Sequence, residues 1–122
     1  MTTTSVETEL YRTLNEFRER FNTNPRVQKL IVGWERNILV DAMDTGEQHT
    51  LVVKDMQMAE VVPGLDESNE TVHLQGEESL LIDMFAGRNK PAAMLMDGVL
   101  AVFSSDKDKV KLEALAMVIW GI

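Results

Sequence analysis

The sequence has no cysteine among its 122 residues. This absence excludes disulfides, thiolate zinc sites, iron–sulfur clusters and cysteine nucleophiles, and it suits a reducing compartment. We therefore expect no redox chemistry from the protein's own side chains.

Basic side chains are scarce, because 12 Lys and Arg stand against 20 Asp and Glu and give a formal net charge of −8. Phosphate binding depends on clustered Lys and Arg, so this balance argues against a nucleic-acid partner. The segment 7–20 carries four acids and three bases. We expect only weak or transient contact with anionic membranes.

Long apolar runs are also missing. No stretch approaches the roughly 20 residues that span a bilayer, and the N-terminus lacks the charged and apolar regions of a signal peptide. We therefore expect a soluble, cytoplasmic protein. The chain is long enough for one continuous core without a structural metal. We expect a single domain over 1–122, with helices in 1–33 and the sheet and remaining helices in 34–122.

Motifs for catalysis or metal binding are few. His49 and His73 lie on expected strands without the further ligands, at suitable spacing, that a metal site needs. The acidic segment 41–47 lacks the alternating oxygen ligands and distal glutamate of a calcium loop. There is no Gly-x-Ser-x-Gly elbow and no glycine-rich phosphate loop. We predict no catalytic residue, metal or cofactor, although a small hydrolase or isomerase with an acid pair stays open as a third function.

Apolar periodicity predicts the helices. From Val6 to Phe21 apolar residues recur at steps of three and four, which is typical of an amphipathic helix. Asn24 and Pro25 predict the cap and first turn of a short second helix that ends at Gly33. Further helices are expected over 77–86, from 91 onward, and from about 107 to 120.

Strand-forming residues predict five strands, over 34–43, 49–54, 58–62, 71–75 and 99–103. The first two form a hairpin through turn residues at 44–47, and the third continues the meander. Helices stand before, between and after these strands. This order predicts an α+β fold in which the helices cover one sheet.

Two features of the apolar residues suggest more than an ordinary core. Methionine, which adapts to irregular space and to ligands of differing shape, occurs eight times. The tail 114–122 has no polar side chain on any face, so we expect it to be covered on all sides. The strand 99–103 likewise needs burial of both faces or a partner on one of them. These patterns favour a cavity or a dimer.

The segment from Gly87 to Val102 combines a glycine, a proline four residues later, a small-residue helix, a second glycine and a strand. It follows a tryptophan-led strand, a hairpin, the strand Thr71-Val-His-Leu and the acidic helix Gly76-Glu-Glu-Ser-Leu-Leu. In this order, from Trp34 to Leu115, the chain resembles the sterol carrier protein type two domain. The resemblance implies a five-stranded mixed sheet covered by about five helices, which enclose a hydrophobic tunnel. It also implies non-enzymatic binding and transfer of fatty acids, fatty acyl-CoA, sterols or other apolar molecules.

The resemblance further implies which residues contact the lipid. The residues that would line or close the tunnel are Leu81, Met84, Phe85, Met94, Val102, Leu115, Met117 and Ile119. Arg88 and Lys90 would lie near an anionic head group.

Three departures from the family pattern carry expectations of their own. Lys90 replaces the usual Asn or Asp before the proline, so the helix that follows loses its usual cap. The turn at 55–57 lacks a common glycine. Val99 and Ala101 fall where many relatives carry outward lysines. This last departure predicts a homodimer through the strand Val99 to Phe103.

An alternative function follows from the same residues. The fold could serve as a dimerisation or scaffolding module whose cavity is filled by its own methionines and tail, assisting a lipid-modifying enzyme. Bound lipid would separate this alternative from a lipid carrier.

Overall fold

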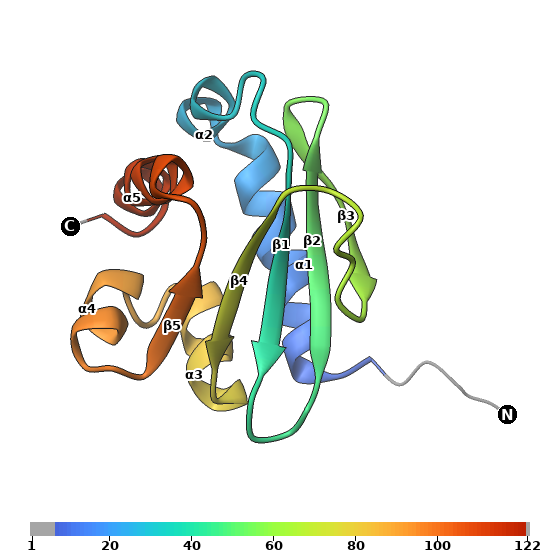
Figure 1. Cartoon of the computed structure of the whole chain (residues 1–122), viewed down its shortest axis with the longest axis vertical. Coiled ribbons are helices and arrows are strands. Elements are labelled where there is room, and N and C mark those ends of the chain that lie inside the picture. Colours follow the sequence, from blue (N-terminus) through green and yellow to red (C-terminus); the bar gives the residue numbers. More distant parts are fainter. Residues whose placement is uncertain (1–6, 122) are drawn as a thin grey trace, which may run out of the picture.

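The computed structural model describes residues 7–121, which form one mixed sheet with helices around it (Figure 1). The helices are α1 (Glu9–Thr23), α2 (Pro25–Leu30), α3 (Glu78–Phe85), α4 (Pro91–Met96) and α5 (Asp106–Trp120). The strands are β1 (Arg36–Ala42), β2 (Gln48–Lys54), β3 (Gln57–Pro63), β4 (Thr71–Gly76) and β5 (Leu100–Phe103). Each helix and strand predicted from the sequence is confirmed, with ends displaced by a few residues. The inward position predicted for Val6 lies outside the described residues.

The sheet has the order β3-β2-β1-β4-β5. β1 runs parallel to β4, and the other neighbouring pairs are antiparallel. This pairing confirms a five-stranded mixed sheet and an α+β fold. Because β3 and β4 lie on opposite sides of β1 and β2, the connection between them has to cross the sheet.

Alternation along β1 separates the two faces of the sheet. Ile38, Val40 and Ala42 belong to the hydrophobic core that the helices cover. α1 contributes its apolar stripe to this core and lies behind the sheet in Figure 1. The buried residues of that stripe are Leu10, Leu14, Phe17 and Phe21.

The opposite face is covered by the β3–β4 connection. There the Thr50 hydroxyl donates to the Gly64 carbonyl oxygen at 2.8 Å and accepts from the Asp66 amide at 2.9 Å. The Asn37 side-chain amide donates to the Asp66 carbonyl oxygen at 3.0 Å. These bonds hold the connection over the centre of β1, so Leu39 is buried on this face as well.

The first turn of α5 attaches the C-terminal helix to the start of β1. Asp108 is only 3% exposed and accepts hydrogen bonds from Trp34 Nε1 and Arg36 Nε, each at 2.8 Å. Ser105 caps the helix by accepting from the Asp108 amide at 3.1 Å. Helix α5 also packs against α2 and α4.

The expectation that the apolar tail is covered on all sides is wrong for the single chain. In α5, Leu115 is buried, but Met117 is 55% exposed. The outer face of β5 is also uncovered within one chain, because Val99 and Phe103 are 39% and 57% exposed.

Candidate functional site

An aromatic cluster lies between α1, α3 and the last turn of α5. Trp120 stacks on Phe17 with ring centroids 5.5 Å apart, and Phe85 meets Phe17 edge-on at 4.9 Å. The Trp120 indole N–H donates to the Met84 carbonyl oxygen at 2.7 Å. The end of α5 is thereby inserted at the junction of α1 and α3, whose packed interface we call the α1–α3 seam.

The structure brings most of the predicted lining residues into one core around this cluster. Five of them, Leu81, Met84, Phe85, Met94 and Leu115, are buried. Val102 and Ile119 are partly buried and pack against the same core. Met117 lies apart, on the exposed side of α5.

The side chains that meet at the seam include two that the lipid prediction missed, Phe17 and Trp120. Phe17 was assigned to an amphipathic helix that the resemblance did not connect with the lipid. Trp120 was treated only as part of an apolar tail. Its position at the very end of that tail was the available signal, because an aromatic ring with a polar N–H suits a partly buried anchor.

Two surface depressions lie away from this cluster. The larger, about 370 Å³, is open to solvent and is formed at the ends of β4 and β5 beside Leu80 of α3. The smaller, about 220 Å³, lies between Trp34, Arg36 and the first turns of α5. None of the eight predicted lining residues contributes to either depression. Apart from Met117, these residues belong to the same core as the aromatic rings or pack against it.

The two predicted head-group residues follow the end of α3. Arg88 forms two hydrogen bonds with Asp83 Oδ1, from Nε at 3.0 Å and from Nη2 at 2.8 Å. Lys90 precedes α4 and provides no side-chain cap, which confirms the expected loss. The positive charge of Arg88 is thus already paired within the chain.

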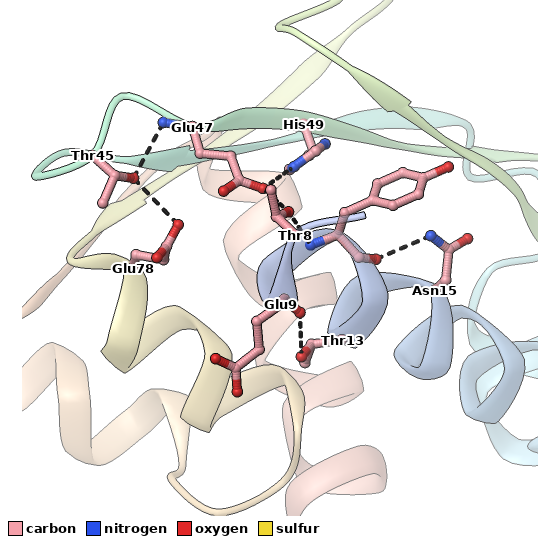
Figure 2. A network of polar contacts seen from close by, with 9 residues as sticks. Thr8, Glu9, Thr13, Asn15, Thr45, Glu47, His49 and Glu78 are labelled. Carbon is pink, nitrogen blue, oxygen red and sulfur yellow. Dashed lines mark hydrogen bonds and ion pairs between the residues drawn. The ribbon is translucent and has the colours of Figure 1, made fainter. Parts of the chain in front are cut away.

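A polar cluster occupies the other end of the α1–α3 seam, where both helices begin (Figure 2). His49 Nε2 lies 2.6 Å from Glu47 Oε2, and the hydroxyl of Thr8, the N-cap of α1, donates to the same carboxylate. Glu78, at the start of α3, accepts from the Thr45 hydroxyl at 3.3 Å. The β1–β2 hairpin therefore connects the first turns of both helices.

Hydrogen bonding sets the charges in this polar cluster. Burial alone would raise the pKa of Glu47, but hydrogen bonds from Thr8, His49 and Glu78 hold it below its ordinary value. The hydrogen bond to Glu47 raises the pKa of Glu78, and burial raises it further. Glu47 is therefore the ionised member of the pair, and Glu78 is the member that retains a proton more readily.

His49 is the most buried titratable side chain of this cluster. It is 7% exposed, and the ring of Tyr11 packs on it with centroids 5.3 Å apart. Its Nδ1 atom has no hydrogen-bond partner among the described residues. The sequence interpretation treated both histidines as structural. His73, on the opposite face of the sheet, fits that interpretation because Nε2 contacts Asp41 Oδ2 at 3.2 Å.

Other kinds of site find no support within residues 7–121. No group of three or more His, Cys, Asp or Glu side chains in this range could hold a metal ion. No helix in the same range is long and apolar enough to cross a membrane.

No protein-family model and no curated protein matches the sequence. The structure, however, is similar to the solution structure of the sterol carrier protein domain 2 of Helicoverpa armigera. That comparison covers 100% of this chain and 97% of the other, with a TM-score of 0.66 and 12% identity. The chain has the sterol carrier protein 2 fold. The resemblance seen in the sequence is confirmed at the level of the fold.

Two further structures show where this fold occurs. Palmitated SCP2L2 from Aedes aegypti matches 93% of this chain and 95% of its own, at 15% identity and a TM-score of 0.57. The sec-alkylsulfatase Pisa1 from Pseudomonas sp. matches 75% of this chain but only 14% of its own, at 14% identity and a TM-score of 0.56. The sterol carrier protein 2 fold thus occurs both alone and as a small part of an enzyme.

Proposed function

We propose that the protein is a non-enzymatic carrier that binds and transfers apolar molecules such as fatty acids, fatty acyl-CoA or sterol-like lipids. The site lies in the α1–α3 seam, in the space that Trp120 occupies. The observation that carries this proposal is the placement of Trp120 between Phe17 and Met84, in the last turn of a helix whose Met117 is 55% exposed. The palmitated protein of the same fold supports an acyl chain as the ligand.

The energies permit a lipid to displace Trp120. Burying about 14 methylene groups gains about 11 kcal/mol at 0.8 kcal/mol each. Removing a buried tryptophan side chain from a core costs about 3–5 kcal/mol. The acyl chain therefore retains a surplus after the last turn of α5 has moved away.

The predicted contacts remain part of this proposal. Met84 and Phe85 contact Trp120, Leu81 and Leu115 belong to the same core, and all four would contact the chain that replaces the indole. Arg88 would hold an anionic head group after releasing Asp83, with Lys90 two residues away. The whole chain would act as one cytoplasmic domain that contacts membranes only transiently, without a cofactor or a nucleic-acid partner.

Tryptophan fluorescence tests the proposal directly. The chain has two tryptophans, so Trp34→Phe leaves Trp120 as the only emitter. Adding palmitate should shift the emission of Trp120 to longer wavelength, because the indole moves into water. Native mass spectrometry of the freshly purified protein, followed by organic extraction, should then identify a bound lipid. A clean lipid-free protein that also fails to take up palmitate would contradict the proposal.

We also propose a homodimer through β5, where Val99 and Phe103 expose apolar surface on an edge strand. The double variant Val99→Lys with Ala101→Lys should yield monomers in sedimentation experiments. An unchanged sedimentation mass would remove this proposal. A lipid-free dimer would instead favour the scaffolding alternative.

A further inference from the structure

The buried ring of His49 has one nitrogen atom that the fold does not use. Among the described residues, Nδ1 of His49 is the buried side-chain polar atom without a hydrogen-bond partner. Buried polar groups in proteins are nearly always paired, because an unpaired one loses its hydrogen bond to water and gains nothing. An unpaired buried nitrogen indicates a missing partner.

The other ring nitrogen determines what that partner must be. His49 Nε2 lies 2.6 Å from Glu47 Oε2, and Glu47 is held ionised by its hydrogen bonds. An ionised carboxylate can only accept, so Nε2 is assigned the proton. When the ring is neutral, Nδ1 presents a lone pair, which can accept a hydrogen bond but cannot donate one.

The charges around the His49 ring further limit which chemical group can pair with Nδ1. Glu78 lies against Glu47, and Asp44 accepts from the Glu78 amide at 2.9 Å. No Lys or Arg within residues 7–121 forms an ion pair with any of these three acids. A carboxylate or phosphate group would be repelled here, whereas an uncharged hydroxyl group would not.

The position of His49 connects it with the proposed lipid site. His49 lies opposite Val40 in the register and shares the helix-covered face of β2 with Leu51 and Val53. The polar cluster is at one end of the α1–α3 seam, and the Phe17 and Trp120 rings are at the other. Thr8 and Phe17 are nine residues apart on α1, which corresponds to about 13 Å along the helix axis. That length suits an extended apolar chain.

We propose that His49 Nδ1 accepts a hydrogen bond from the hydroxyl group of a neutral apolar alcohol whose hydrocarbon part lies in the α1–α3 seam. This inference rests on the proposed lipid-binding function and names the ligand class for one end of the site. It places neutral hydroxyl groups at the start of α1 and α3. An anionic head group belongs at the opposite end, where Arg88 follows α3.

Three probes of equal chain length test the inference. These are 1-hexadecanol, its methyl ether and palmitate, titrated into the Trp34→Phe protein with Trp120 emission as the signal. The ether keeps the oxygen but has no proton to donate. Because one net hydrogen bond distinguishes the two, hexadecanol should bind roughly fivefold to tenfold more tightly than the ether.

Two histidine variants locate the effect. His49→Phe keeps an aromatic ring against Tyr11 and should remove the preference for hexadecanol over the ether. His73→Phe is the matched control, because His73 also contacts a carboxylate but lies on the opposite face of the sheet. It should leave the preference intact. Should His49→Phe fail to fold, the ¹⁵N resonances of the unaltered histidines provide the same test. Hexadecanol should then move the Nδ1 resonance of His49 upfield and leave His73 unchanged.

The outcomes distinguish failure of this inference from failure of the proposed lipid-binding function. If hexadecanol and the ether bind equally, or if palmitate shows the dependence on His49, the inference is wrong and the lipid carrier stands. If none of the three probes binds, the proposed function fails and the inference falls with it. A hexadecanol preference that depends on His49 and not on His73 supports both.

Discussion

The side chain of Asn22 pairs with both backbone groups of Met58, as the backbone of a neighbouring strand would. The Asn22 side-chain amide donates to the Met58 carbonyl oxygen at 2.9 Å, and its Oδ1 accepts from the Met58 amide at 2.7 Å. Arg18 adds a bond to the same carbonyl oxygen and another to Ala59. Helix α1 thereby satisfies the open side of the edge strand β3, which would otherwise expose unpaired backbone groups.

Asn22→Ala should therefore destabilise the protein by about 1–3 kcal/mol, because the Met58 amide loses its acceptor while Met58 stays buried. Urea unfolding followed by circular dichroism measures this loss. Asn15→Ala is the matched control, since the Asn15 side chain donates only within α1, to the Tyr11 carbonyl oxygen. The control should change stability by less than about 0.5 kcal/mol. Equal losses in the two variants would show that the pairing with β3 contributes nothing.

The turn between β2 and β3 places two residues in the left-handed region. Asp55 and Met56 have φ values of 54° and 62°, and neither is glycine. A side chain in this region costs roughly 1–2 kcal/mol through contact with the backbone. Met56→Gly should therefore stabilise the protein by about 1 kcal/mol, as measured by an increase in the midpoint of urea unfolding.

The control for this change is Met43→Gly. Met43 is similarly exposed, but its φ is not positive. Glycine at position 43 relieves no backbone strain and only increases the conformational entropy of the unfolded chain, so Met43→Gly should lower stability. A loss of stability at both positions would contradict the strain assigned to Met56.

The local elements could be predicted because each has a signal within a few neighbouring residues. The apolar spacing of α1 gave its length, and Asn24 with Pro25 marked α2, where the Asn24 side chain does accept from the Arg26 and Val27 amides. The turn without glycine was visible in the same way. These features depend on backbone preferences that act over one or two turns.

The contacts between distant segments could not be predicted from residues alone. Parallel pairing of β1 with β4 leaves no local pattern, and only the family resemblance suggested a mixed sheet. In the polar cluster, Thr8 contacts Glu47, which is 39 residues away in the chain, and Glu47 contacts His49, which is two residues away. Trp120 contacts Phe17, although the two residues lie near opposite ends of the sequence. The candidate site is made of such contacts. The residues predicted to line a tunnel, except Met117, lie in or against the core, but the contact of Trp120 with that core was not predicted.

The buried pair of Asp108 and Arg36 makes stability depend on pH. Burial alone would raise the pKa of Asp108, but hydrogen bonds from Arg36 and Trp34 lower it below its ordinary value. A carboxyl group with a lowered pKa in the folded state stabilises the fold above its unfolded pKa, about 3.9, and this contribution is lost as the pH falls through the folded value.

Asp108→Asn should accordingly cost roughly 2–4 kcal/mol at pH 7, because Arg36 loses its buried counter-charge. The difference from the unaltered protein should begin to shrink below about pH 4, because the unfolded chain then takes up a proton at Asp108 before the folded protein does, and it should be lost once the pH falls through the lowered folded pKa. Urea unfolding at pH 7, 5 and 3 tests both parts. Asp106→Asn, two residues away and fully exposed beside Lys109, should change stability by less than about 1 kcal/mol at each pH. A constant difference across this range would rule out the charge pair as the cause.

The proposed lipid site predicts opposing effects of Trp120 on folding and on lipid binding. Its ring fills the space between Phe17 and Phe85, so Trp120→Ala should lower stability by about 2–3 kcal/mol, somewhat less than for a fully buried tryptophan. The same change removes the group that an acyl chain has to displace. Palmitate should therefore bind the variant more tightly than the unaltered protein, by roughly tenfold for each 1.4 kcal/mol of displacement no longer required. Isothermal titration with palmitate measures the affinity without depending on Trp120 fluorescence.

The control for this prediction is Met117→Ala, on the exposed side of the same helix. It removes apolar surface from α5 without opening the seam, so stability and palmitate affinity should both stay nearly unchanged. If Trp120→Ala instead weakens palmitate binding, the indole is part of the wall that holds the lipid. The lipid would then lie beside Trp120 rather than in its place, and the route into the core would have to open elsewhere than at the last turn of α5.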